Sequence, residues 1–257
     1  MKAPSPAAFW LQFLALLPVT GVQGLWIRQR APRMAARIEN GASGRVGAGE
    51  RAIEVLVTGE STAVGVGCHA AEQAVSMQFA SRLASLGGAT VDWQVIGRNG
   101  ARATDIVQLL TTQRPKSPDP NRVAVVLLGA NDVTSLHSLR HWYEQLVAVR
   151  TRLRQRGFGS IFLAPVPPMW GFTLLPRPLR NVLGARARQL EAERIRVASL
   201  YPDVTALVTD FPLDTELLAE DGYHPGPDAC AMWGNDLAEQ VLASLRVSPG
   251  PAAPGGR

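Results

Sequence analysis

Short apolar runs alternate along this chain with longer stretches in which apolar residues recur every three or four positions. The longer stretches have the spacing of one helix face, as Val75, Phe79, Leu83 and Leu86 illustrate. The short runs are typical of strands buried on both sides. Residues 53–58, 91–96, 123–128, 160–164 and 204–208 are predicted as strands. Residues 70–86, 103–110, 139–156, 180–200 and 227–245 are predicted as helices.

This regular alternation of strand and helix predicts a mostly parallel sheet with helices on both faces. The chain has 257 residues, of which 46% are hydrophobic, so it can bury a full core. Residues 51–246 have the size of one domain, and we expect this region to be the catalytic domain. Ligands of such a sheet bind at the carboxyl ends of its strands.

An apolar segment, residues 7–27, precedes the domain and is interrupted by two glutamines and a proline. It is long enough to cross a hydrocarbon core, so we expect membrane association through an uncleaved anchor or a helix on the membrane surface. The alternatives are a soluble protein and a cleaved signal peptide, for which Lys2 is a minimal basic start and residues 22–24 a poor cleavage site. The arginines after this segment favour the cytoplasmic face, whereas cleavage would mean export.

The basic charge of the chain belongs to this N-terminal region. The formal net charge is +5, and residues 1–51 hold seven Lys or Arg against two Glu, while the rest contains 19 residues of each sign. A basic face for nucleic acid on the domain is therefore excluded. Residues 1–50 are predicted as the apolar segment followed by a basic linker, Gly-rich at residues 41–49, and residues 247–257 as a disordered Pro/Gly tail.

Residues suited to ester hydrolysis follow three of the predicted strands. Ser61 comes after the first, where a sharp turn would expose its hydroxyl and direct the amides of a following helix toward developing negative charge. Gly97 and Gly100 come after the second and permit close approach of backbone to substrate. Asn131 comes after the third and offers a side-chain N–H to a tetrahedral oxyanion. Each alone is more often a helix cap, a turn or a loop.

A fourth element, the sequence Asp221-Gly222-Tyr223-His224, places an acid and an imidazole three residues apart. The acid would fix the tautomer of the imidazole, whose other ring nitrogen would then take the proton of a serine. A pair with this spacing is usually a solvated turn when it stands alone. Its value lies in its combination with the other three elements.

The order of the four elements resembles the SGNH (GDSL-type) hydrolase family, whose name lists its Ser, Gly, Asn and His. The resemblance covers residues 53–245 and implies a three-layer α/β/α fold with a flavodoxin-like, mostly parallel five-stranded sheet. It implies a catalytic triad of Ser61, His224 and Asp221. It further implies an oxyanion hole formed by the backbone amides of Ser61 and Gly100 and the side chain of Asn131. No metal or organic cofactor is implied.

Two positions depart from the family pattern. The usual Gly-Asp-Ser is Gly59-Glu60-Ser61 here, which lengthens the acid by a methylene and changes the hydrogen bonding of the turn rather than the type of reaction. The second block lacks a small residue before its glycine, so Gly97 competes with Gly100 for the oxyanion role.

The substrate is the part that the sequence determines least. The loop at residues 165–176 carries Trp170 and Phe172 among prolines, and we expect these two aromatics to bind substrate, with a structural plug as the alternative. Together with the N-terminal segment, the loop suggests a small-molecule or lipid-like ester with an apolar acyl group. The family itself includes lipases, lysophospholipases, thioesterases and carbohydrate acetylesterases.

Metal sites, a disulfide framework and a nucleotide-binding loop are not predicted, because the residues that they require are too few or wrongly spaced. Cys68 and Cys230 are too few for a zinc site, give no disulfide framework and are predicted as small buried residues. His137 and His141 lack the acidic partner of a metalloprotease motif. Gly65-Val66-Gly67 lacks the Lys of a phosphate-binding loop, so no nucleotide is expected.

Two alternative functions remain open. A lipase-type α/β-hydrolase also uses Ser, Asp and His, although its serine usually follows several strands and its acid lies well before the histidine. A catalytically silent, membrane-tethered binding module would keep the fold without the reaction, and Glu60 is the one hint of it.

Overall fold

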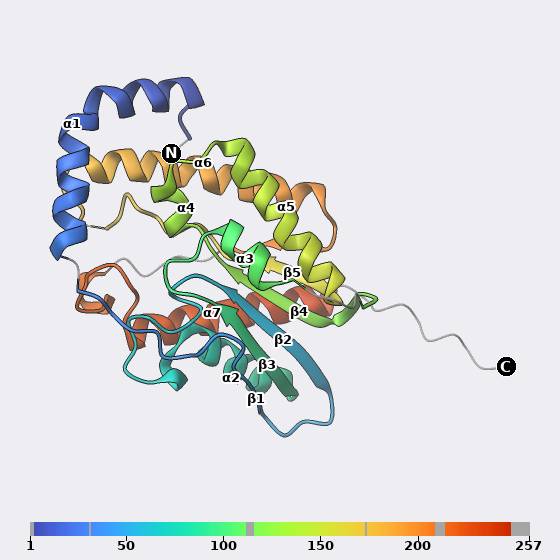
Figure 1. Ribbon diagram of the computed structural model, residues 1–257. Coiled ribbons are helices and arrows are strands. Elements are labelled where there is room, and N and C mark those ends of the chain that lie inside the picture. The colour runs from blue at the N-terminus through green and yellow to red at the C-terminus, as the bar shows by residue number, and fades with distance from the viewer. Residues whose placement is uncertain (1–2, 31, 112–115, 173, 209–213, 248–257) are drawn as a thin grey trace.

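One six-stranded sheet lies between two layers of helices in the computed structural model, which describes residues 3–30, 32–111, 116–172, 174–208 and 214–247 (Figure 1). Strands β2 to β6 are parallel, and the order across the sheet is β1-β3-β2-β4-β5-β6. The predicted mostly parallel α/β sheet is confirmed, and its five parallel strands have the flavodoxin-like order. The strands are β1 Ser43–Val46, β2 Ala52–Gly59, β3 Thr90–Gly97, β4 Asp119–Leu127, β5 Phe158–Leu163 and β6 Val204–Ala206.

Strand β1 is a sixth strand that the glycine-rich composition of residues 41–49 does not predict. It pairs antiparallel with β3 at the edge of the sheet, where Gly44 stands opposite Trp93. A Cβ atom on Gly44 would lie 2.8 Å from the Trp93 ring, so a side chain could not fit there without displacing it. This part of the predicted linker is instead an edge strand, because its glycine provides close packing rather than flexibility.

The predicted helices are present with shifted bounds. The helix expected at residues 70–86 begins only at Val75, because Ala71–Gln73 form a separate 3₁₀ turn and the backbone of Ala74 is extended. The short helix α4 was not predicted, and residues 248–257 of the expected tail lie outside the described residues. The α-helices are α1 Pro6–Arg30, α2 Val75–Gly87, α3 Ala103–Leu109, α4 Ala130–Ser135, α5 Leu139–Gln155, α6 Leu179–Leu200 and α7 Pro227–Val247, and a second 3₁₀ turn is Thr215–Leu217.

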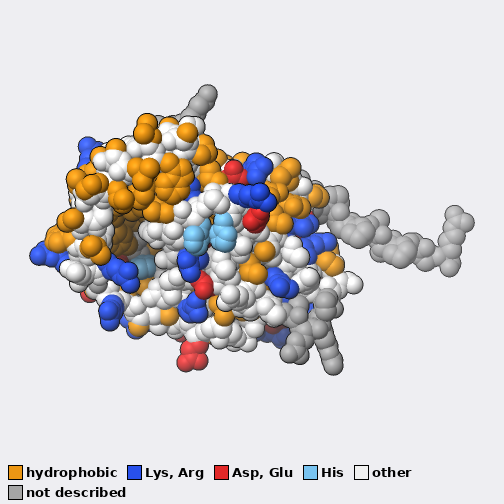
Figure 2. Space-filling model, turned by 45° about the horizontal axis from the view of Figure 1, so that its top comes forward, with side chains coloured by type: hydrophobic (Ala, Val, Ile, Leu, Met, Phe, Trp, Pro, Cys, Tyr) orange, Lys and Arg blue, Asp and Glu red, His pale blue; other side chains and the backbone are white. Residues whose placement is uncertain are grey.

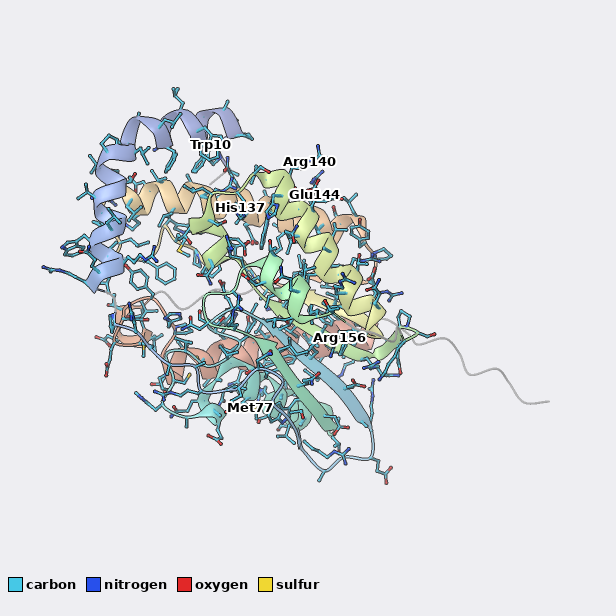
Figure 3. All side chains as sticks on the ribbon, viewed as in Figure 1. Trp10, Met77, His137, Arg140, Glu144 and Arg156 are labelled. Atoms are coloured by element: carbon cyan, nitrogen blue, oxygen red, sulfur yellow. The ribbon has the colours of Figure 1, made fainter. Side chains whose placement is uncertain are left out.

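The central strands are buried on both faces, as their continuous apolar runs predict. Val55 and Val57 of β2 pack in one core with α2 and α7, whereas Leu56 faces the opposite core with α3, α5 and α6. Figure 3 shows side chains filling both layers, while Arg140 and Glu144 form an ion pair of 2.8 Å on α5 at the surface. Because β3 and β4 flank β2 on opposite sides, a crevice forms at the carboxyl ends of these three strands.

Helix α1 packs against the domain instead of standing apart from it. Figure 1 shows it as two arms that meet at a sharp bend, and Pro18 lies near the middle of the helix. Phe9 packs on Val182 of α6, and Gln23 donates to the Arg177 carbonyl (2.8 Å) and accepts from the Leu179 amide (3.1 Å). By length and composition alone α1 could also cross a membrane.

Candidate active site

Ser61 lies in a tight turn just beyond the end of β2. The turn is fixed by the Glu60 amide, which donates to the Leu127 carbonyl (3.0 Å), and by the Val66 amide, which donates to the Ser61 carbonyl (3.0 Å). Residues 61–67 are turn rather than helix, so the expected helix N-terminus beside the nucleophile is absent from this segment. Ser61 is only 6% exposed, contrary to the expected open position, because it lies within the lining of a cavity.

The loop that carries Ser61 touches the loop that carries His224. Gly67 has a φ of +100°, and a Cβ there would lie 2.5 Å from the Pro225 carbonyl oxygen and 2.9 Å from the His224 Cβ. A side chain at this position would therefore push the two loops apart. This contact brings together residues that are more than 150 positions apart in sequence.

Asp221 and His224 form a hydrogen-bonded pair, as the sequence predicts. Oδ2 of Asp221 lies 2.5 Å from Nδ1 of His224, while Oδ1 accepts from the amides of Tyr223 and His224, both at 3.0 Å. Burial alone would raise the pKa of Asp221, but the hydrogen bonds and charge of His224 and the two amides lower it below its usual range. The acid is therefore ionised at neutral pH and orients the imidazole.

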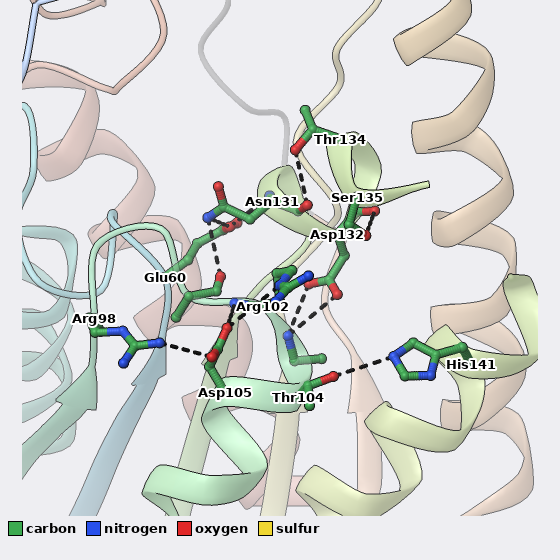
Figure 4. A network of polar contacts seen from close by, with 12 residues as sticks. Glu60, Arg98, Arg102, Thr104, Asp105, Asn131, Asp132, Thr134, Ser135 and His141 are labelled. Atoms are coloured by element: carbon green, nitrogen blue, oxygen red, sulfur yellow. Dashed lines mark hydrogen bonds and ion pairs between the residues drawn. The ribbon is translucent and has the colours of Figure 1, made fainter. Parts of the chain in front are cut away.

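The Asn131 side chain is held by an acid that the sequence did not connect to it. Glu60 Oε2 accepts from Nδ2 of Asn131 (2.6 Å) and from its backbone amide (3.0 Å), and Oε1 accepts from the Ala130 amide (2.8 Å) (Figure 4). Nδ2 of Asn131 also donates to the Ala101 carbonyl (3.1 Å). Both hydrogens of the side-chain amide are thus engaged within the protein, so an oxyanion must displace one of these acceptors.

A cavity of about 710 Å³ joins these groups. Ser61, Asn131 and His224 line one side of it, although no hydrogen bond joins Ser61 to His224 among the described residues. Such contacts are often looser in the absence of substrate. Figure 2 shows hydrophobic side chains gathered around a hollow at one end of the molecule. The apolar wall of the cavity includes Phe13, Leu17, Met169, Phe172, Leu179 and Val182.

Residues 57–231 match the model of the GDSL-like lipase/acylhydrolase family. The chain belongs to this family. The resemblance seen in the sequence is therefore confirmed. A GDSL-like esterase of Mycobacterium tuberculosis is 27% identical over 200 residues, which cover 76% of this chain and 62% of that protein. The chain thus spans less than two thirds of that relative.

Solved structures of other esterases share the fold. A psychrotrophic esterase from Pseudoalteromonas sp. is similar with a TM-score of 0.54 and 14% identity, over 76% of this chain and 99% of that one. A family 3 carbohydrate esterase from Clostridium thermocellum is similar with a TM-score of 0.54 and 16% identity, over 77% and 98%. At these identities the likeness concerns the fold alone.

Of the three remaining predicted site residues in this GDSL-like chain, Phe172 lines the cavity, whereas Trp170 and Gly100 do not. Phe172 lines the cavity and stacks on Tyr223, with ring centroids 6.3 Å apart. Trp170 lies outside the cavity lining, because it packs beside Gly184 of α6 under the Arg188 guanidinium. Gly100 has a φ of +76° and is exposed, and its neighbour Asn99 rather than Gly100 itself reaches the cavity wall.

Two features of the site escaped sequence reasoning. Residues of α1 line the cavity, and no polar motif marks them. Cys68 and Cys230 are both buried, as expected, but their Sγ atoms lie 3.4 Å apart. The two cysteines are 162 positions apart in sequence, so no local pattern predicts that they lie together. Their proximity follows from the contact between the loop of Ser61 and the loop of His224.

Glu60→Gln is expected to lower the free energy of unfolding by about 2 kcal/mol. Glutamine has one acceptor oxygen in place of two, so its NH₂ group would face N–H donors that now bond to the carboxylate of Glu60. Chemical denaturation would measure the loss, with the exposed Glu72→Gln as control. Equal stability of both variants would show that the Glu60 carboxylate does not hold the loop.

Asp132 accepts from the Ala103 amide (3.1 Å) and joins α4 to α3 (Figure 4). Burial and the nearby Glu60 carboxylate raise the pKa of Asp132 to about 7, against the opposing hydrogen bond from Ala103. The folded state therefore binds this proton more tightly than the unfolded state, whose pKa is 3.8, so stability from this group is lost as pH rises from 4 to 7.

Asp132→Asn removes this titration and keeps an oxygen for the Ala103 amide. Relative to the native chain, the variant is expected to gain about 2 kcal/mol of stability between pH 5 and pH 8. Unfolding curves at both pH values, with the exposed Asp228→Asn as control, would measure it. A stability difference that does not change with pH would contradict the raised pKa of Asp132.

Proposed function

We propose that this chain is a serine esterase that uses Ser61 as nucleophile, His224 as general base and Asp221 as the group that orients His224. The observation that carries the proposal is that His224, hydrogen-bonded to Asp221, lines the same cavity as Ser61, in a chain of the GDSL-like acylhydrolase family. The spacing of 2.5 Å between Asp221 and Nδ1 of His224 leaves Nε2 as the ring nitrogen for proton transfer.

The reaction proceeds by two acyl transfers. His224 takes the proton of the Ser61 hydroxyl as Oγ attacks the ester carbonyl, and then gives it to the leaving alcohol. Water then loses a proton to His224 as its oxygen attacks the acyl carbon. The bond from that carbon to Ser61 Oγ breaks, the carboxylic acid leaves, and His224 returns the proton to Oγ, which restores Ser61. Neither transfer calls for a group beyond these side chains and water.

The tetrahedral oxyanion would be held by the Ser61 amide together with Asn131, whereas Gly100, the third donor expected from the sequence, lies outside the cavity lining. The Asn131 amide first exchanges its bond to Glu60 or Ala101 for a bond to the oxyanion, since both of its hydrogens are engaged in the resting site. Burial raises the pKa of Glu60, although its carboxylate accepts hydrogen bonds from three N–H groups. The ionised form of Glu60 is therefore destabilised by its surroundings. An oxyanion that displaces Glu60 therefore replaces one anion–amide contact with another.

The apolar wall of the cavity favours an ester with an apolar acyl group, including lysophospholipid-like substrates. Phe172 and Met169 lie on the loop after β5 and face the same space as Ser61. A cavity of about 710 Å³ has the size of a typical small-molecule site and exceeds what an acetyl group needs. We further propose that α1 associates with membranes, with the cytoplasmic face favoured and export the outcome if it is cleaved.

A p-nitrophenyl alkylphosphonate tests the proposal directly. Ser61 Oγ should attack phosphorus and expel p-nitrophenolate, leaving one phosphonyl group per chain on the peptide that contains Ser61. The exposed Ser199→Ala variant should be labelled equally, as a control. If the folded native chain releases no p-nitrophenolate and stays unlabelled, the catalytically silent binding module is the better description.

A further inference from the structure

Helix α1 forms one wall of the catalytic cavity. Phe13 and Leu17 from its first arm and Leu25 from its second line the same space as Ser61 and His224. Opposite them stand residues of α6 and of the loop after β5. The depth of the site beyond the catalytic residues is therefore set by the N-terminal helix, rather than by the parallel sheet.

Two glycines of α1 keep this space open. Gly21 and Gly24 are three residues apart, so they lie on one helix face, and both line the cavity. A Cβ atom at either position would meet nothing within 4 Å. Glycine is among the poorest helix formers, and neither position needs it to avoid a clash. The empty volume beside them is free to hold part of a ligand.

The outer face of α1 is apolar as well. Leu11 is 75% exposed and Leu14 is 61% exposed, and Trp26 is also among the exposed large hydrophobic residues. A helix that is apolar all round needs an apolar environment on both sides, and the protein covers only one side of α1. The exposed face adjoins the face that lines the cavity.

Charge indicates which surface this face contacts. Arg28, Arg30 and Arg33 follow the apolar residues and are exposed, and Arg28 also lines the cavity. The first acidic residue of the sequence is Glu39, so nothing upstream offsets these charges. Exposed apolar residues beside arginines match a bilayer that contains anionic lipids. The bend of α1 and its contacts with α6 keep it along the protein surface rather than in a straight span.

We propose that the cavity beneath α1 is an acyl-chain site that opens onto a lipid bilayer bound by the outer face of the same helix. The inference rests on the proposed function and gives it a substrate class: an ester of a membrane lipid, whose acyl chain passes along Gly21 and Gly24 and whose carbonyl reaches Ser61. Helix α1 then serves at once as membrane contact and as substrate-site wall.

Gly24→Trp in the full-length chain tests the acyl site. The indole would fill the space beside the helix, so kcat/KM for p-nitrophenyl decanoate should fall at least 10-fold more than kcat/KM for p-nitrophenyl acetate. Gln12→Trp adds the same side chain at an exposed position of α1 outside the cavity lining, and both esters should then react as with the native chain. Equal effects of Gly24→Trp on the two esters would overturn the acyl site.

Vesicle flotation tests the membrane contact. The native chain should float with vesicles of phosphatidylcholine and phosphatidylglycerol, and less with phosphatidylcholine alone. Leu11→Gln combined with Leu14→Gln should reduce the bound fraction at least 10-fold. A folded native chain that floats with neither vesicle overturns this part of the inference.

The two proposals fail in different ways. Acetate hydrolysis and phosphonate labelling depend on the catalytic residues rather than on the wall formed by α1, so their absence in the native chain counts against the esterase. A chain that hydrolyses acetate but shows no loss on decanoate with Gly24→Trp keeps the esterase and loses the acyl site.

Discussion

Ser61→Ala is expected to reduce kcat for p-nitrophenyl esters by about 10⁵-fold or more. Alanine leaves the turn and its backbone bonds in place but removes the only atom that can carry the acyl group. The residual rate would come from the oxyanion hole and from substrate binding, which do not need the hydroxyl. Steady-state rates on the acetate and butyrate esters would measure the loss.

The matched control for this loss is Ser199→Ala, which removes a hydroxyl from an exposed position of α6. It should leave both kcat and KM unchanged. Circular dichroism and thermal unfolding of Ser61→Ala should match those of the native chain within about 0.5 kcal/mol, since no core group is altered. A folded Ser61→Ala chain that retains a tenth of the native rate would exclude Ser61 as the nucleophile.

Asp221→Asn is expected to lower kcat about 10⁴-fold, which is the second large effect. Asparagine keeps an oxygen for the Tyr223 and His224 amides, so the loop should persist. Its NH₂ group, however, would stand 2.5 Å from Nδ1 of His224, where the native oxygen now lies. Nδ1 would then become the acceptor and Nε2 would carry the proton, so the imidazole could not take the proton of Ser61.

An unchanged KM separates this tautomer effect from a loss of folding. The rate of p-nitrophenolate release should fall together with kcat in Asp221→Asn, while KM for the ester changes little, because Asp221 does not face the substrate. Asp228→Asn, an exposed change in the first turn of α7, should leave all these values as in the native chain. A kcat within 10-fold of native for Asp221→Asn would remove the acid from the mechanism.

The parts of the fold that could be predicted are those encoded in a local pattern. The runs that became β2 and β4 end in consecutive buried apolar residues because both of their faces are covered, so their composition identifies them as strands. Asp221 and His224 are three residues apart, and their pairing needs only one short loop. Ser61 was placed by its position at the end of β2.

The parts that could not be predicted depend on contacts between distant segments. Glu60 binds an amide 71 positions away, so no local pattern could show that the longer acid reaches Asn131. Helix α1 is apolar on every side, so the sequence could not distinguish the face that meets α6 from the face that is exposed. Trp170 was assigned to the site because it is aromatic, yet it packs against α6, beside Gly184 and beneath the Arg188 guanidinium.

The buried cysteine pair carries information about where the chain resides in its cell. Cys68 and Cys230 need to close from 3.4 Å to about 2.05 Å to form a disulfide. Cytosolic glutathione keeps such thiols reduced, whereas the oxidising exterior of a cell closes them. The oxidation state of this pair, trapped by alkylation before the cell is opened, would therefore record the side of the membrane that the catalytic domain occupies, which the arginines after residues 7–27 only suggest.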